Sequence, residues 1–417
     1  MNAHGTSVSH IHHLKDCILF SERLASVKPS PSMAAKAKVD ALRAQGRKVI
    51  DFTIGEPDFD TAPHIIEGGI NALKSGQTRY TASAGTPALR AAIARKLERE
   101  NQLSFRAEEI VVGCGAKHII YNAFAASLNE GDEVIVPAPF WVSYPDMVAL
   151  QAAKPVIVAC SEESGFKLSA DVLAKAITPR ARWVILNTPN NPTGAVYTRE
   201  ELEAICDVLR AYPQVWLMTD EIYEHFVYNG VTHVSPLQIA PDLRERTLLV
   251  NGLSKAYAFT GWRIGYGAGP VELVKRINLL LTQSTTCASA MSQAAAVVAL
   301  DGPQECVAEA AHLFESRRNR VMELIAKIPG LSCMQPDGAF YVFVNVQKLL
   351  GLKTVAGNVL QSDVDVMNFF IEQAGVAVID GTSYGCPGFL RMSFATSMEE
   401  IEAGYAAIAQ AVAACKA

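Results

Sequence analysis

The segment TLLVNGLSK, residues 247–255, contains the pattern from which the fold can be predicted. Its first part, Thr247 to Val250, is a short strand candidate, after which the chain turns polar and reaches Lys255. Strand candidates of this kind alternate with amphipathic stretches from about Glu109 to Ile264. Such an alternation indicates a parallel sheet that is covered by helices.

Seven strand candidates lie in this region: Ile110 to Val112, Glu133 to Val136, Pro155 to Val158, Trp183 to Leu186, Val215 to Met218, Thr247 to Val250, and Ile264 to Ala268. The helix candidates between them include Lys117 to Leu128, Ser169 to Ala176 and Arg199 to Leu209. Upstream, Thr86 is expected to cap a helix whose first residue is Pro87. We therefore predict an α/β fold with a mainly parallel seven-stranded sheet sandwiched by helices.

The region after Gly302 has a different pattern, which predicts a smaller α+β domain. A long helical pattern comes first, and short strands and a closing helix follow it. The expected elements are a helix from Glu305 to Ile328, strands at Ala339 to Val344, Val376 to Ile379 and Leu390 to Phe394, and a helix that begins at Met398.

The composition argues against several classes of protein, among them nucleic-acid-binding, membrane-spanning and disulfide-rich proteins. A net charge of -5 argues against a nucleic-acid partner, and no apolar run reaches the roughly 20 residues that cross a bilayer. The nine cysteines are scattered and never paired as C-x-x-C, so we expect neither a disulfide framework nor a zinc site, and a reducing cytoplasm fits best. The histidine-containing residues 1–20 are interpreted as a non-exported extension, with metal binding as the less favoured alternative.

Polar clusters follow the carboxyl ends of four predicted strands. They are Gly113 to Lys117, Asn187 to Gly194, Asp220 to Tyr223, and Ser254 to Arg263. In a parallel α/β sheet, ligands bind at that edge. We therefore expect a ligand that contacts several strands at once, as a bound cofactor would.

Lys255 lies in a largely apolar neighbourhood just beyond a predicted strand. Burial lowers the pKa of a lysine amine, which then becomes available as a nucleophile towards an aldehyde. Arg263, eight residues later, offers a second cation for a phosphate. The turn Gly113 to Lys117 precedes a helix, where backbone amides can approach an anion. A surface lysine and an ordinary strand-to-helix turn are the alternatives.

Four further residues suit a flat aromatic ligand that carries a protonated nitrogen. A buried carboxylate such as that of Asp220 needs a cation, and a protonated pyridine nitrogen provides one. Tyr223 and Asn191 can hydrogen-bond a ring oxygen, and Trp141 can stack on the ring. The alternatives are a helix N-cap for Asp220, turn formation for Asn191 and simple packing for Trp141.

Read together, NNPTG at 190–194, DEIY at 220–223 and SKAYAFTGWR at 254–263 resemble the class I and II aminotransferases of the fold type I pyridoxal-phosphate enzymes. IGEPDF at 54–59 is similar to an N-terminal motif of the bacterial aspartate and aromatic aminotransferase branch. The resemblance runs from about Ser30 to the C-terminus, and only the first twenty or so residues fall outside it.

The resemblance implies a cofactor, pyridoxal 5'-phosphate, and a role for each matching residue. Lys255 is expected to carry the cofactor as a Schiff base, and Asp220 to keep the pyridine nitrogen protonated. Tyr223 and Asn191 are expected at the ring oxygen of the cofactor and Trp141 on its ring. Arg263 and the amides of Gly115, Ala116 and Lys117 are expected at its phosphate, and Tyr80 at the phosphate of a neighbouring subunit. Ser254 is expected to contact the cofactor as well. The enzyme is accordingly expected to be a homodimer with shared sites.

The resemblance also implies how the substrate binds. Arg391 matches the arginine that grips the α-carboxylate, because a guanidinium fork fits a carboxylate bidentately. The Gly55 amide, Trp141 and Asn191 are expected to help. Lys28 lies in the segment that resembles the mobile lid, where it suits an acidic substrate side chain or is simply a solvated lysine.

We expect an aminotransferase that uses aspartate, glutamate or aromatic amino acids with 2-oxoglutarate in a ping-pong reaction. A pyridoxal-phosphate lyase or decarboxylase is the alternative, and a non-catalytic aminotransferase-like binding module is a more remote one. The expected division is an extension at 1–20, a lid segment and part of the small domain at 21–55, the large cofactor-binding domain at 56–305, and the C-terminal small domain at 306–417.

Overall fold

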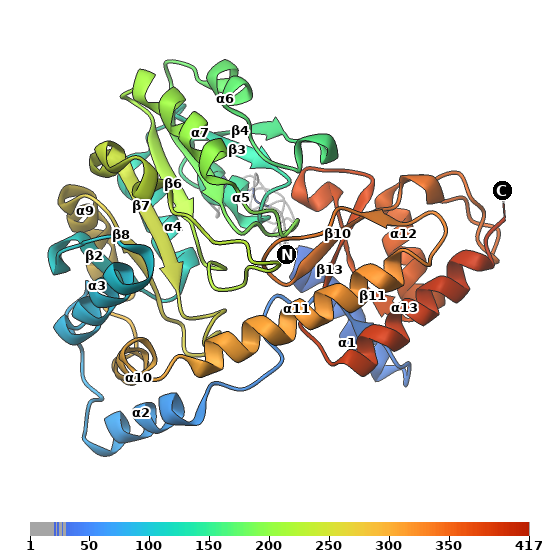
Figure 1. Cartoon of the computed structure of the whole chain (residues 1–417), viewed down its shortest axis with the longest axis horizontal. Coiled ribbons are helices and arrows are strands. Elements are labelled where there is room, and N and C mark those ends of the chain that lie inside the picture. Colours follow the sequence, from blue (N-terminus) through green and yellow to red (C-terminus); the bar gives the residue numbers. More distant parts are fainter. Residues whose placement is uncertain (1–20, 22, 25–26, 28–30, 417) are drawn as a thin grey trace, which may run out of the picture.

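The computed structural model describes residues 21, 23, 24, 27 and 31–416. A seven-stranded sheet has the order β2-β8-β7-β6-β5-β3-β4 (Figure 1). Its strands are β2 (Ile110–Gly113), β3 (Glu133–Ala138), β4 (Lys154–Ala159), β5 (Ala181–Asn187), β6 (Trp216–Asp220), β7 (Thr247–Gly252) and β8 (Gly265–Ala268). Only β8 runs antiparallel to its neighbours, β2 and β7. The predicted mainly parallel sheet of seven strands is confirmed.

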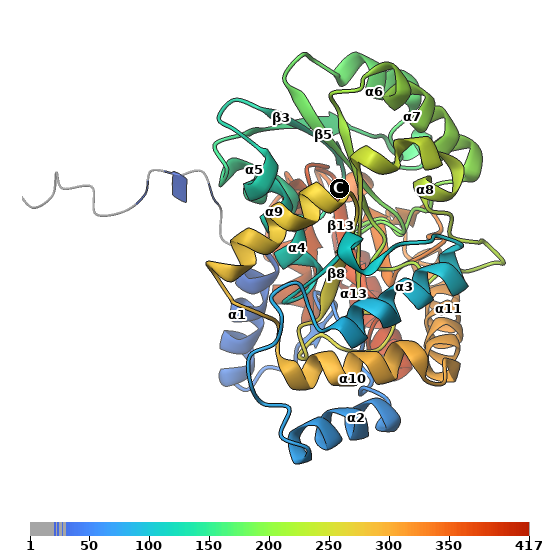
Figure 2. The same cartoon turned by 90° about the vertical axis from the view of Figure 1, so that its left-hand side faces the viewer.

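Helices cover both faces of this sheet, as Figure 2 shows. One face packs against α4 (Ala116–Ser127), α5 (Ser143–Ala149) and α9 (Val271–Thr282). The other packs against α6 (Ala170–Ala176), α7 (Arg199–Ala211) and α8 (Pro236–Ile239) at one end, and against α2 (Pro63–Lys74), α3 (Pro87–Asn101) and α10 (Ala290–Asp301) at the other. Neighbouring strand residues point to opposite faces, so that Leu248 contacts the first layer and Leu249 the second.

The helix starts follow from capping chemistry in the sequence. The Thr86 hydroxyl accepts a hydrogen bond from the Leu89 amide at 3.2 Å, and Pro87 is the first helical residue of α3, as predicted. Thr198 and Glu201 form a capping box at the start of α7. These local signals fix where the helices begin, and the apolar faces fix where they pack.

A smaller sheet has the order β12-β13-β10-β9, next to a separate two-stranded pairing of β1 with β11. Its strands are β9 (Ser332–Cys333), β10 (Tyr341–Asn345), β12 (Ile379–Asp380) and β13 (Phe389–Ser393), and the pair is β1 (Ile50–Asp51) and β11 (Val376–Ala377). The surrounding helices are α1 (Pro31–Ala44), α11 (Glu305–Ile325), α12 (Asp363–Phe369) and α13 (Met398–Ala413). Figure 1 shows α11 running from the large sheet to this smaller part.

The single strand predicted at Val376 to Ile379 is wrong. The chain leaves the β1 pairing at Ala377 and joins the β13 pairing at Ile379, so two short strands belong to two sheets. An apolar run carries no signal for such a change of partner. Among the described residues, no helix is long and apolar enough to cross a membrane.

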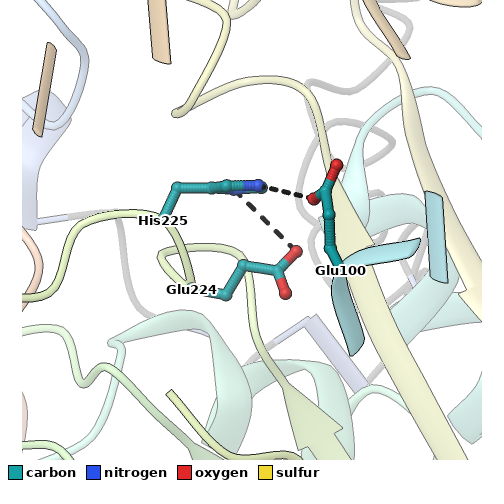
Figure 3. Close-up of side chains that lie close together, drawn as sticks. All are labelled: Glu100, Glu224 and His225. Atoms are coloured by element: carbon teal, nitrogen blue, oxygen red, sulfur yellow. Dashed lines mark hydrogen bonds and ion pairs between the residues drawn. The ribbon is translucent and has the colours of Figure 1, made fainter. Parts of the chain in front are cut away.

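A buried ion network ties α3 to the segment that follows β6. Lys96 is 1% exposed and donates to the Glu224 carboxylate, which also accepts from Asn101 and Asn251, each at 2.6 Å. Figure 3 shows the outer part, where His225 Nε2 lies 3.0 Å from Glu100 Oε2. Burial opposes the ionisation of both glutamates, but the hydrogen bond from His225 and the charge of Lys96 lower the pKa of Glu100 to about 2.

This network lies next to the predicted site in the chain, because Glu224 follows Tyr223 and Asn251 belongs to β7, the strand that leads to Lys255. The two carboxylates lie close enough to His225 to hold a metal ion, but the Lys96 ammonium already neutralises Glu224. This network, here called the ion clamp, joins α3 to β7 and to the segment that follows β6 through buried contacts.

Lys96→Met is expected to destabilise the protein by about 3 to 5 kcal/mol, because it leaves the Glu224 carboxylate buried without its cation. Urea unfolding followed by circular dichroism measures the change. Arg95→Ala is the matched control, since Arg95 on the same helix pairs with Asp301 in an exposed ion pair, whose loss is expected to cost about 1 kcal/mol or less. Equal losses in the two variants would contradict the clamp.

Candidate active site

Three neighbouring parallel strands end at the same edge of the large sheet. Asn187 ends β5 opposite Asp220, which ends β6, and β7 leads directly to Lys255. A cavity of about 290 Å³ opens there. Twelve of the residues predicted to bind cofactor or substrate line it: Gly55, Gly115, Ala116, Lys117, Trp141, Asn191, Asp220, Tyr223, Ser254, Lys255, Arg263 and Arg391.

Lys255 is one of the residues that line the cavity. Its amine donates to the Gly55 carbonyl and lies 5.6 Å from the centre of the Tyr223 ring. Burial is the largest influence on this amine and lowers its pKa to about 8; the charge of Arg391 acts in the same direction, and that of Glu56 opposes it. Near neutral pH, the neutral and nucleophilic form of this amine is therefore far more populated than that of an ordinary lysine, whose pKa is near 10.4.

Asp220 is 3% exposed and presents its carboxylate at the end of β6. Its Oδ2 accepts from the Tyr144 hydroxyl at 2.6 Å, and its Oδ1 accepts from the Ile222 amide at 3.3 Å. Burial raises the pKa of this carboxyl to about 6, although the Tyr144 hydrogen bond opposes the shift. No lysine or arginine of the described chain lies within ion-pair distance of this carboxylate, and the charge of Lys255 favours its ionised form only weakly against burial.

The cavity has an anion-binding end at the start of α4. Gly115 has a φ of 88°, and a Cβ there would lie 2.5 Å from Arg263 Nη2. A Cβ on Gly265 would lie 2.1 Å from the Ala116 nitrogen, so the two glycines let the backbone turn and the neighbouring strand come together. The Arg263 guanidinium donates to the carbonyls of Thr260 and Cys114. Helix amides and a guanidinium converge here without an anion from the described chain.

Arg391 comes from β13 of the smaller sheet and is 3% exposed. It donates to the Thr53 carbonyl at 2.6 Å and to Asn191 Oδ1 at 3.2 Å, and the Tyr341 ring centre lies 4.5 Å from its guanidinium carbon. Its Nε is buried and has no hydrogen-bond partner, and the described chain supplies no carboxylate to it. A buried guanidinium without an anion is costly, which indicates that a ligand carboxylate completes the site.

The aromatic residues of the cavity contact each other. The Tyr223 and Tyr341 hydroxyls lie 2.9 Å apart. The Trp141 ring packs edge-on against Tyr144, with ring centres 5.3 Å apart, and the Lys117 ammonium lies 4.7 Å from the Trp141 ring centre. These contacts hold flat surfaces and hydroxyls around a central space, as a planar ligand requires.

Two predicted residues are not in the cavity. Tyr80 is 87% exposed and lies outside the lining, as it must if it serves a neighbouring subunit. Lys28 lies outside the described residues. Sequence reasoning missed Tyr144, Asn187, Ile222, Thr260 and Tyr341, which also line the cavity. Asn187 opens the predicted loop and carried a positional signal, whereas Tyr341 reaches the site only because the two sheets dock.

Comparisons with known proteins show which family the chain resembles. The sequence model of the family described as aminotransferase class I and II matches residues 47–408. A probable aspartate/prephenate aminotransferase of Rhizobium leguminosarum bv. phaseoli is 46% identical over 396 residues, which cover 95% of this chain and 99% of the relative. An aspartate aminotransferase of Rhizobium meliloti (strain 1021) is 45% identical over 391 residues, 94% of this chain and 95% of the relative.

Solved structures show the same architecture. The crystal structure of the aspartate aminotransferase from Rhizobium meliloti has a TM-score of 0.93 at 45% identity and covers 95% of this chain and 99% of that one. The aspartate aminotransferase from Thermus thermophilus with maleate has a TM-score of 0.88 at 40% identity, with coverage of 94% and 99%. The predicted fold type I architecture is confirmed, and the chain belongs to the class I and II aminotransferase family.

Proposed function

We propose that this aminotransferase moves the amino group of an acidic or aromatic L-amino acid to a 2-oxo acid such as 2-oxoglutarate, with pyridoxal 5'-phosphate bound covalently to Lys255. The observation that carries the proposal is the placing of the Lys255 amine and the Asp220 carboxylate in one cavity that two arginines, Arg263 and Arg391, also line.

The residues fit this cofactor. The glycine cradle before α4 and Arg263 suit a phosphate, and the neutral fraction of the Lys255 amine suits an aldehyde. The Asp220 carboxylate, which lacks a cation in the described chain, suits a pyridinium nitrogen. When bound, pyridoxal phosphate supplies an aldehyde and a ring that withdraws electrons from the bond to be broken.

The chain's own residues then position the substrate and move its proton. Arg391 binds the α-carboxylate, which satisfies its unpaired Nε, and Asn191 orients the guanidinium. Lys255 Nζ, once free, accepts the proton from the α-carbon and returns it later, since its lowered pKa suits a general base near neutral pH. Tyr223 presents its ring towards the amine, and its hydroxyl contacts that of Tyr341.

An acidic substrate is favoured by the charges of the cavity. Lys117, Lys255, Arg263 and Arg391 line it, against the single carboxylate of Asp220. The Lys117 ammonium has no carboxylate partner among the described residues. Maleate, the ligand named with the Thermus structure, is a dicarboxylate, and aspartate and prephenate appear in the names of the relatives. We therefore infer that dicarboxylic donors and acceptors are the preferred substrates.

We also infer a homodimer that works in the cytoplasm. Tyr80 and Leu73 are exposed beside a groove lined by residues of α2 and α10, and a second subunit placed there would give Tyr80 a partner. The eight cysteines of the described chain are free thiols, which suits a reducing compartment.

A donor and acceptor panel tests the proposed function. Purified protein loaded with pyridoxal phosphate is expected to convert aspartate to its oxo acid beyond one equivalent per loaded site only when an acceptor, 2-oxoglutarate or prephenate, is present in excess. Phenylalanine and alanine serve as donors without a second carboxylate and are expected to have a higher KM. Release of ammonia or carbon dioxide in the absence of an acceptor would instead identify a lyase or a decarboxylase.

The pH dependence of cofactor capture tests the role of Lys255. Cofactor-free protein mixed with pyridoxal phosphate and trapped with borohydride is expected to gain the label on Lys255, at a rate that rises with pH around a midpoint of about 8, because the neutral amine reacts. An ordinary lysine has a pKa near 10.4. Lys255→Ala is expected to lose the label. A midpoint near 10, or a label on another lysine, would refute the assignment.

Arg391→Lys tests the carboxylate site. The change keeps the charge but removes the planar fork, so KM for the amino acid is expected to rise roughly 10- to 100-fold while pyridoxal phosphate binding stays unchanged. Arg317→Lys is the matched control, because Arg317 makes a two-pronged pair with Asp58 and does not line the cavity. An unaltered KM in Arg391→Lys would remove the assigned role.

A further inference from the structure

Few groups contact the Asp220 carboxylate directly and stabilise its ionised form. Its side chain receives two hydrogen bonds within the described chain, from the Tyr144 hydroxyl and from the Ile222 amide. The contact with Tyr144 is the shorter, at 2.6 Å against 3.3 Å. A short hydrogen bond from a neutral donor to a buried carboxylate stabilises the ionised form and fixes the direction of the accepting oxygen.

The Tyr144 hydroxyl acts as the hydrogen-bond donor to Asp220. It lies in the first turn of α5 and is 2% exposed. Burial and the neighbouring Asp220 raise the pKa of its hydroxyl well above 10, so Tyr144 keeps its proton near neutral pH. Oδ2 of the ionised Asp220 therefore accepts from Tyr144, and Oδ1 accepts from the Ile222 amide.

The same turn also carries the residue expected to stack on the cofactor ring. The Tyr144 amide donates to the Trp141 carbonyl at 3.0 Å, and their rings meet edge to face at 86°. The short segment from Trp141 to Tyr144 thus positions both the indole ring of Trp141 and the hydroxyl that hydrogen-bonds Asp220.

We propose that Tyr144 is a positioning residue whose hydroxyl holds Asp220 ionised and in the orientation that receives the protonated ring nitrogen of the cofactor. This inference rests on the proposed function, since it assumes that Asp220 meets a pyridinium. It adds a residue that neither the motifs nor their spacing indicate, because Tyr144 lies 76 positions away from its partner in the chain.

The other charged and titratable groups around Asp220 do not replace Tyr144. Lys255 favours the ionised carboxylate across the cavity, and Tyr223 faces it from the following turn. Glu221, the adjacent residue, disfavours the ionised form. The Glu221 carboxylate accepts from Thr219, Ser235 and His233, so these three groups serve Glu221 and not Asp220.

Tyr144→Phe tests the proposal, since it removes one oxygen and keeps the ring contact with Trp141. The dissociation constant for pyridoxal phosphate is measured on cofactor-free protein between about pH 5 and 9. We expect roughly tenfold weaker binding near pH 7, and the pH below which affinity is lost to move upward by about one unit, because a carboxyl without its donor protonates at higher pH. In the loaded enzyme, kcat is expected to fall while KM for the amino acid stays nearly constant.

Two comparisons keep the test specific. Tyr197→Phe removes another buried hydroxyl, one that accepts from the Leu168 amide at 2.8 Å, and is expected to leave the pH midpoint in place. In the Asp220→Asn background, Tyr144→Phe is expected to cause no further loss of affinity, because the two changes act through one carboxylate.

The outcomes separate this proposal from the proposed function. Wild-type protein that fails to bind pyridoxal phosphate would contradict the proposed function itself. Wild-type protein that binds it, with an unshifted midpoint in Tyr144→Phe or an equal further loss in the Asp220→Asn background, would overturn the role of Tyr144 alone. Loss of the pH midpoint in Asp220→Asn by itself supports the link between this carboxylate and cofactor affinity.

Discussion

The cavity at the carboxyl edge of the large sheet holds more positive charge than the described chain neutralises. Arg391 is buried without a carboxylate, Arg263 donates only to carbonyls, and Lys255 donates to the carbonyl of Gly55. Burying a cation such as Arg391 is costly unless an anion arrives from outside. The phosphate and carboxylates of the proposed ligands would supply such anions, and the ion clamp at Lys96 and Glu224 contacts β7, the strand that leads to Lys255.

The two parts of the chain meet in this cavity. Asp220 and Lys255 come from the seven-stranded sheet, whereas Arg391 and Tyr341 come from the smaller one. The segment around Gly55 joins them, because the Phe52 carbonyl accepts from the Ser393 amide while the Gly55 carbonyl accepts from Lys255. A substrate carboxylate bound to Arg391 therefore lies within reach of groups on both sheets.

Much of this arrangement could be predicted from the sequence. The seven strands were predictable because each is a short apolar run. Polar clusters follow four of them, and the cluster residues Asp220 and Lys255 reach one edge by topology alone. Tyr144 and Tyr341 could not be found this way, because their hydroxyls contact the site only after α5 and β10 have packed. The single strand predicted at Val376 to Ile379 was wrong for a related reason, because the partner with which a strand pairs is decided by the three-dimensional packing.

The central claim is that the chain transfers an amino group through a cofactor that retains it between two substrates. A single turnover with aspartate and no acceptor measures this most directly. The account predicts one equivalent of oxo acid per loaded site, an accompanying change in the visible absorption of the cofactor, and recovery of the original spectrum on addition of 2-oxoglutarate. Continued product formation beyond one equivalent without an acceptor, with release of ammonia or carbon dioxide, would contradict it.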